Sequence, residues 1–297
     1  MSRNLEGCKV LAKGSLWRDG AQNREGFVIS MSDTMLLSLS AIIALVPLSM
    51  LAMRHDQRPD TVFWMVLVVA VAGPVNWVLV SMAGSWQTDL ATALWVTVAA
   101  TMAIFAVITI LTRESWRLAP LVSAYMAALG VIAMIWGHAP DKPLEVAASV
   151  GGWIGIHIGV SVATYALVTI AAVAALAAFL QERALKNKRP TKLSRLLPSV
   201  ADCEELEVRL LVLGEIVLAM GLATGMALQY GDTGTLLVFD HKTVLTITAF
   251  VVIGGLLAAH YKTGLRGRQA ARIVLLAYLL LTLGYPGVKF ITDVVLS

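Results

Sequence analysis

Eight long apolar runs constrain the fold of this sequence more than any other feature. Each run reaches about the 17 to 25 residues that a helix needs to cross a hydrocarbon layer roughly 30 Å thick. The runs cover residues 35–53, 61–82, 89–112, 118–136, 153–180, 206–229, 242–260 and 271–290. They are apolar on every face, whereas the strands of a membrane β-barrel alternate apolar and polar residues. The sequence therefore predicts an all-α, polytopic membrane bundle with about eight transmembrane helices.

The composition supports this interpretation. The 297 residues are 58% hydrophobic and 14% charged, against about 25% charged in a typical soluble domain. The connections between the runs are short, so we expect no sizeable soluble domain. Cys8 and Cys203 are far apart and form no Cys-x-x-Cys or Cys-x-x-Cys-His motif, which excludes a disulfide framework and covalent haem attachment.

Lysine and arginine residues predict the orientation of the bundle. Short loops rich in these residues stay on the cytoplasmic side of a membrane, and loop 181–205 is the richest of them. Its first basic residues are Arg183, Lys186, Lys188, Arg189, Lys192 and Arg195. Counting from this loop, segments 83–88, 137–152, 230–241 and the C-terminus face outward. The net charge of +4 is explained by contact with anionic lipid, so the sequence gives no reason to expect a nucleic-acid partner.

The N-terminal segment disagrees with this topology. The same count places residues 1–30 outside, yet the segment is basic and lacks the apolar core of a signal peptide. Our hypothesis is that this basic extension is not part of the native chain and that translation starts at Met31. Residues 31–297 would then form the whole transmembrane domain.

His157 begins a polar stripe in the run 153–180. Ser161, Thr164, Tyr165 and Thr169 follow it at offsets that fall within an arc of roughly 140° on a helix. A stripe of this kind faces neighbouring helices or a cavity. One explanation is hydrogen bonding between helices, and the other is a binding site, because ionisable groups in a membrane are costly and frequently functional.

Two further histidines belong to the run 242–260. His241 precedes it and His260 closes it, so about 28 Å of helix separates them and they cannot share one ligand. His241 and His157 both lie at outer ends, so a compact group bound between their two helices could reach both.

Glu215 and Asn76 are the remaining polar residues of interest within the runs. Arg209 lies six positions before Glu215 and therefore on the opposite face of the helix, so we expect the Glu215 carboxyl to be protonated or paired with another helix. Asn76 lies beside Gly73 and Pro74, which predict a kink. For both residues a structural role stays open beside a functional one.

The second half of the chain resembles a known family. The stretch from His157 to Tyr165, with Ser161 between them, is similar to the conserved helix of the CcsA/CcmC cytochrome c assembly superfamily. Further matching motifs follow in the expected order over residues 150–290, which most resembles the YpjD/HemX-type inner-membrane branch. They are Gln181-Glu182-Arg183, Leu197-Pro198, Glu204-x-Leu206-x-x-Arg209, Thr224-Gly225, Asp240-His241-Lys242-Thr243, His260-Tyr261-x-x-Gly264-x-Arg266-Gly267-Arg268 and Gly284-Tyr285-Pro286-Gly287.

The resemblance implies a bacterial inner-membrane protein in which His157 and His260 bind haem in separate sites. Neutral imidazole is an ordinary axial ligand of haem iron, and Ser161 or Tyr165 could orient the ring of His157. No other metal site is implied. Segment 231–240, where haem-handling members are rich in tryptophan, holds one aromatic residue here, and His55 is a candidate second ligand for His260.

Three functions follow as hypotheses. The first is a haem-handling or accessory protein of cytochrome biogenesis, with haem and cytochrome assembly components as partners besides membrane lipid. The second is a membrane scaffold or regulator that keeps the architecture without binding haem, and the third is a small-solute permease that uses Glu215 and Asn76. No phosphate loop, His-Glu-x-x-His or nucleophile elbow is present in the sequence, so we do not expect an enzyme.

Overall fold

The apolar runs become helices in the computed structural model. It describes residues 31–51, 59–82, 89–137, 151–188, 192–235 and 240–287, and these contain helices, turns and no strands. The long helices are α2 (Met31–Leu51), α3 (Thr61–Met82), α4 (Leu90–Leu111), α5 (Ala119–Ile135), α6 (Gly151–Lys186), α8 (Val200–Thr233), α9 (His241–Thr263) and α10 (Arg268–Thr282). Shorter elements are the 3₁₀ turn η1 (Ser115–Leu118), the helix α7 (Lys192–Leu196) and the π-helical turn η2 (Leu283–Gly287). The prediction of an all-α membrane bundle is confirmed.

The last apolar run forms a shorter helix than the sequence predicts. Seven helices within the described residues are long and apolar enough to cross a membrane. The run 271–290 gives a 15-residue α10 followed by the π-helical turn η2, whose sequence is LGYPG. Two glycines and a proline disfavour a regular α-helix, which explains why α10 ends early.

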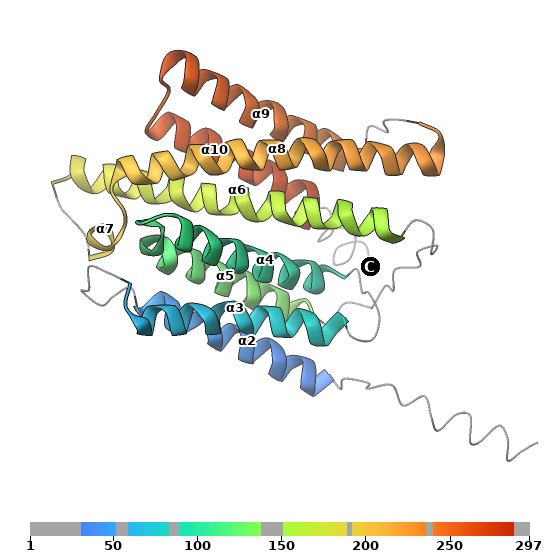
Figure 1. The fold of residues 1–297 in the computed structure, drawn as a ribbon, viewed down its shortest axis with the longest axis horizontal. Helices are drawn as coiled ribbons and strands as arrows, with labels where there is room; N and C mark the ends of the chain where they lie inside the picture. Colours follow the sequence, from blue (N-terminus) through green and yellow to red (C-terminus); the bar gives the residue numbers. More distant parts are fainter. Residues whose placement is uncertain are drawn as a thin grey trace, which may run out of the picture. The chain divides into compact units, whose positions relative to one another are not determined.

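Residues 38–297 form one compact unit, and helix α6 lies at the centre of its bundle. It packs against α4, α8 and α10, whereas α3 and α5 pack on α4, and α9 packs on α8 and α10. Figure 1 shows α6 and α8 running side by side through the bundle. The most apolar window of α6 is 78% buried, against 28% for that of α8 and 17% for that of α9. Its many alanines allow this close packing, because small side chains let helix backbones approach one another in a membrane.

Most of the basic residues in the described ranges lie at one end of the bundle. Helices α4, α6 and α9 end there, and α5, α8 and α10 begin there (Figure 1). Arg113, Arg117, Lys186, Lys262 and Arg268 are at these helix ends. We call this the basic end. The N-terminal part of α6, which carries His157, lies at the opposite end of the bundle.

Polar caps define several helix ends. The side chains of Asp89, Ser199 and Asp240 accept hydrogen bonds from backbone N–H groups in the first turns of α4, α8 and α9. Such caps satisfy donors that have no partner inside the helix. Residues 1–30, which the Met31 hypothesis concerns, lie outside the described residues.

Candidate functional site

The imidazole of His157 is oriented by a hydroxyl group on α8. His157 Nδ1 lies 3.0 Å from Thr224 Oγ1. The Thr224 hydroxyl points its own proton at the carbonyls of Met220, 2.9 Å away, and Gly221, 3.0 Å away. A Thr224 hydroxyl that donates to either carbonyl accepts from His157 Nδ1, and in the neutral ring this arrangement leaves the lone pair on Nε2.

Gly225 makes room for the same ring. A Cβ atom at this position would lie 3.1 Å from His157 Cε1 and 3.8 Å from Nε2. A methyl group there would push the imidazole away from α8, because 3.1 Å is tighter than ordinary carbon contact. Thr224 and Gly225 thus act together, one as the hydrogen-bond acceptor and the other as the space for the ring.

The predicted polar stripe on α6 divides into a surface part and a core part. Ser161 is exposed and donates to the backbone carbonyl of His157 at 2.8 Å, so its hydroxyl does not orient the imidazole. Thr164, Tyr165 and Thr169 are buried. Thr164 and Thr169 donate to carbonyls one turn earlier on their own helix, and Tyr165 reaches other helices.

Tyr165 belongs to a hydroxyl network that joins α5, α6 and α10. Its hydroxyl lies 3.0 Å from that of Tyr278 and 3.1 Å from Thr282 Oγ1. Tyr278 also bonds Tyr125, while Thr282 donates to the Tyr278 carbonyl. The four hydroxyls thus form a continuous chain from Tyr125 through Tyr278 and Tyr165 to Thr282. The network ties α10 to α6 inside the bundle.

His260 is oriented by the loop that follows its own helix. Its Nδ1 lies 3.0 Å from the carbonyl oxygen of Leu265. A carbonyl can only accept, so Nδ1 carries the proton and Nε2 again keeps its lone pair. The loop turns back because Gly264 adopts a left-handed φ of 70° and its N–H bonds the His260 carbonyl, an arrangement typical of helix ends.

Two carboxylates from other helices lie against this loop at Gly267, and one of them bonds its backbone. Glu204 of α8 accepts a hydrogen bond of 2.9 Å from the Gly267 N–H. Gly267 has a φ of 69°, and a Cβ there would lie 2.8 Å from Glu182 Oε1 of α6. Both the backbone conformation and the neighbouring carboxylate therefore require glycine, which gives a physical reason for the Arg-Gly-Arg sequence at the start of α10.

His241 does not join either of these two groups. It is exposed as the first residue of α9, whereas His260 lies in the last turn of the same helix. His157 contacts Thr224 and Gly225 of α8 and forms no hydrogen bond or ring contact with His241. His55 lies outside the described residues. Within the described ranges, no group of three or more His, Cys, Asp or Glu residues could hold a metal ion.

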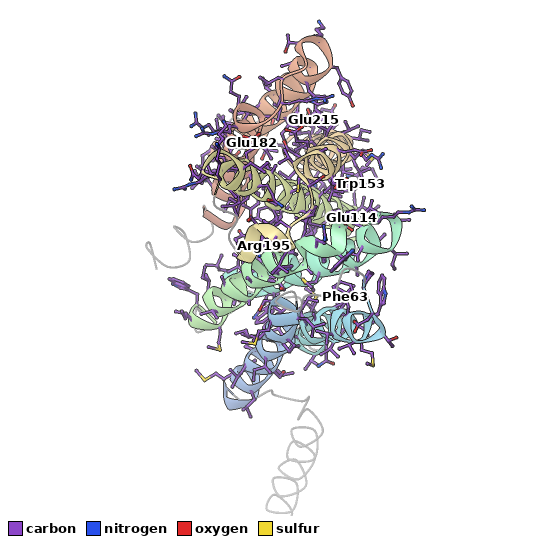
Figure 2. The ribbon with its side chains drawn as sticks, turned by 90° about the vertical axis from the view of Figure 1, so that its left-hand side faces the viewer. Phe63, Glu114, Trp153, Glu182, Arg195 and Glu215 are labelled. Carbon is purple, nitrogen blue, oxygen red and sulfur yellow. The ribbon has the colours of Figure 1, made fainter. Side chains whose placement is uncertain are left out.

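Glu215 faces α9 from the middle of α8. Its Oε1 lies 3.0 Å from where a Cβ of Gly254 would be, and its buried Oε2 has no hydrogen-bond partner in the described part of the chain. Figure 2 shows Glu215 on the same side of the bundle as Glu182, away from Phe63. Arg209 instead pairs with Glu205 on the surface. Asn76 of α3 is exposed, so neither residue forms a site with the histidines.

Comparison with known proteins finds a matching family and similar chains. The family described as Cytochrome C assembly protein matches residues 60–296. A protein of Azospirillum brasilense, whose printed name is "Uncharacterized 28.8 kDa protein in nifR3-like 5'region", is 53% identical over 272 residues, which cover 90% of this chain and 100% of that protein. The inner membrane protein YpjD of Escherichia coli K12 is 27% identical over 183 residues, covering 62% of this chain and 67% of that protein.

Proposed function

Because the chain belongs to the cytochrome c assembly protein family, we propose that it handles haem as a non-enzymatic accessory of cytochrome biogenesis, with His157 and His260 as ligands in two separate sites. The observation that carries this proposal is the orientation of the two imidazole rings. Each directs Nδ1 at an acceptor, Thr224 Oγ1 or the Leu265 carbonyl, and keeps the Nε2 lone pair for a ligand. Metal-binding histidines are commonly oriented by a second partner in this way.

The residues present fit a haem ligand better than an enzyme centre. Haem iron takes a neutral imidazole nitrogen as an axial ligand. Gly225 lets the imidazole of His157 lie against α8, where a side chain would push the ring away. In the part of the chain that the structure describes, no cluster of carboxylates, cysteines and histidines offers a competing metal site.

We place the protein in the bacterial inner membrane. The Escherichia coli relative is an inner membrane protein, and the chain has helices suited to spanning a membrane. With loop 181–205 in the cytoplasm and the C-terminus outward, the His157 site faces outward and the His260 site faces the cytoplasm. In this orientation, the proposed partners are haem and components of the cytochrome assembly machinery.

The absorption spectrum of the full-length protein, purified in detergent from a haem-replete host, tests the proposal. We expect a Soret band that weakens in His157→Ala and in His260→Ala. Thr224→Val removes the acceptor of His157 Nδ1 and should weaken the outward site about 10-fold, while Thr224→Ser keeps the hydroxyl and should retain it. Ser161→Ala is the matched control, because that hydroxyl bonds the backbone and not the ring.

Absence of haem from the wild-type protein, both as purified and after titration with haem, would contradict the proposal. The chain would then be a scaffold or regulator of the same architecture. In that case His157→Ala should lower the midpoint of thermal unfolding without any loss of a bound chromophore.

A further inference from the structure

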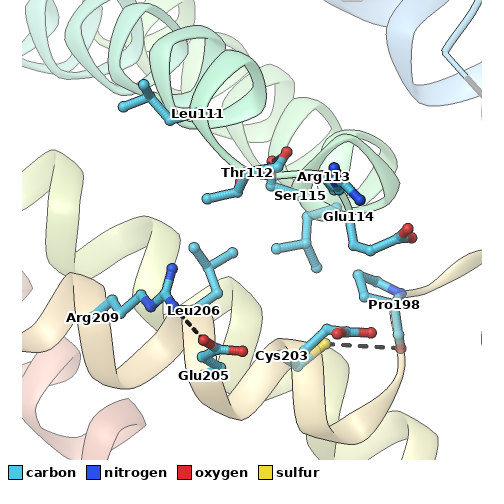
Figure 3. Close-up of a pocket in the computed structure, with 12 residues that line it drawn as sticks. Leu111, Thr112, Arg113, Glu114, Ser115, Pro198, Cys203, Glu205, Leu206 and Arg209 are labelled. Carbon is cyan, nitrogen blue, oxygen red and sulfur yellow. Dashed lines mark hydrogen bonds and ion pairs between the residues drawn. The ribbon is translucent and has the colours of Figure 1, made fainter.

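A cavity opens at the basic end between the end of α4 and the beginning of α8. Its volume is about 260 Å³. Figure 3 shows Leu111 to Ser115, at the end of α4 and in the turn after it, on one side of the cavity and α8 on the other. Its lining belongs neither to the His157 site nor to the His260 site.

The floor of the cavity is apolar and its rim is charged. Leu118, Cys203 and Leu206 are nearly fully buried and line the floor. The charged lining residues are Arg113, Glu114, Asp202, Glu205 and Arg209. An apolar floor beneath a charged rim is the arrangement expected where a helix bundle meets the boundary between lipid and water.

Exposed apolar stripes extend from the cavity along both helices. Val107, Ile110 and Leu111 are exposed in the last turns of α4. On α8, Leu213, Ile216 and Met220 are exposed and lie on the same helical face as Arg209. The distance along α8 from Arg209 to Met220 is about 16 Å. An acyl chain attached to a headgroup in the cavity could therefore follow this face.

Some charged side chains of the rim have a partner and one does not. Glu205 pairs with Arg209, and Glu114 pairs with Arg117 at 3.6 Å. Asp202 accepts a hydrogen bond from the Ser199 hydroxyl. Arg113 is exposed, and its side chain has neither an ion pair nor a hydrogen bond to any described residue. One guanidinium is thus available, beside three carboxylates.

From this cavity we infer a binding site for a phospholipid whose headgroup carries both a phosphate and a primary ammonium group, as in phosphatidylethanolamine. The Arg113 guanidinium matches the phosphate, since arginine binds phosphate oxygens through its paired N–H donors. The ammonium group donates hydrogen bonds to Asp202 and Glu114.

Charge complementarity favours this lipid over others with the same phosphate. Of the three carboxylates in the lining, Glu205 pairs with Arg209 and Glu114 pairs with Arg117, so Asp202 has no ion pair with a described residue. An anionic headgroup such as phosphatidylglycerol brings a phosphate for Arg113 but no cation for Asp202. Phosphatidylcholine carries a cation but its trimethylated nitrogen has no N–H to donate. The primary amine is therefore the feature that the rim selects.

The test uses the full chain in nanodiscs that contain equal amounts of phosphatidylethanolamine, phosphatidylglycerol and phosphatidylcholine, with retained lipid counted by native mass spectrometry. We expect phosphatidylethanolamine to be enriched about threefold, the scale of an exposed charge pair. Arg113→Gln and Asp202→Asn should each remove the enrichment. Lys186→Gln, which removes a charge of the basic end outside the cavity, should retain it.

Equal retention of the three lipids by the wild-type protein would overturn the inference, as would undiminished enrichment in Arg113→Gln. Displacement of the lipid by soluble phosphoethanolamine at equal concentration would also overturn it, because the acyl chains would then contribute nothing. Circular dichroism and elution volume check the fold of each variant. If Arg113→Gln misfolds, Asp202→Asn decides the result.

Discussion

The two histidine sites orient their rings by different means. His157 depends on Thr224, which lies 67 residues further along the chain and on another helix. His260 depends on Leu265, which is 5 residues away in the loop that ends its own helix. The first site exists only when α6 and α8 are packed in register, whereas the second forms with the end of α9. The orientation of one imidazole therefore depends on tertiary packing, and that of the other depends on local chain geometry.

The glycines of the two sites differ in the same way. Gly225 is an ordinary helical residue whose missing side chain makes room for a ring on a neighbouring helix. Gly267 has a left-handed φ and touches a carboxylate, so its backbone conformation is also at stake. Substitution at Gly267 should accordingly cost more than substitution at Gly225.

The largest expected effect is that of Gly267→Ala. We expect it to lower the free energy of unfolding by about 3 kcal/mol, because it combines a strained left-handed alanine with the contact to Glu182. Gly264→Ala places an alanine at φ 70° and ψ 26°, the left-handed helical region, with no atom within 4 Å of the new Cβ, and should cost about 1 to 2 kcal/mol. Gly267 instead combines φ 69° with ψ −145°, a region that only glycine adopts readily. The measurement is equilibrium unfolding in detergent micelles. Equal losses for the two variants would show that neither the ψ of Gly267 nor the Glu182 contact adds to the cost.

An intermediate effect is expected for Gly225→Ala, about 1 kcal/mol of lost stability from displacement of the His157 ring. The control is Gly159→Ala on α6, where no atom lies within 4 Å of the new Cβ and stability should rise slightly. A double-mutant cycle sharpens the test: in a His157→Ala background, Gly225→Ala should lose its cost. A cost that persists without the imidazole would assign the strain to something other than the ring.

The smallest effect is expected at the N-terminus of α9, at the end of the helix opposite His260. Here the charged side chain of Asp240 caps the helix. Hydrogen bonds from Thr243 lower the pKa of the Asp240 carboxyl below its usual 3.8. Its stabilising effect is therefore complete above pH 3.8 and is lost as the pH falls through the lowered value. Asp240→Ala should cost about 0.5 to 1 kcal/mol at neutral pH and nothing in strong acid, as measured by thermal unfolding across pH. A cost of Asp240→Ala that is equal at both pH values would contradict a charged cap.

The sequence predicted the helices well because long apolar runs specify membrane spans directly. It also predicted correctly that Arg209 turns away from Glu215, since helical spacing alone settles that point. The roles of Thr224 and Gly225 could not be derived, although the pair stood out in the family motif, because they depend on the register between α6 and α8. Ser161 was expected to support the imidazole, yet it bonds the helix backbone and faces outward. Helical periodicity places Ser161 beside His157 but does not indicate which acceptor its hydroxyl takes.

The hydroxyl chain from Tyr125 to Thr282 has one further consequence. Thr282 donates to the Tyr278 carbonyl one turn earlier on α10, and its oxygen meets the Tyr165 hydroxyl of α6. The network therefore fastens α10 and α5 to α6 through side-chain hydroxyl groups. The interior of this bundle is held together by side-chain hydrogen bonds between helices as well as by apolar packing.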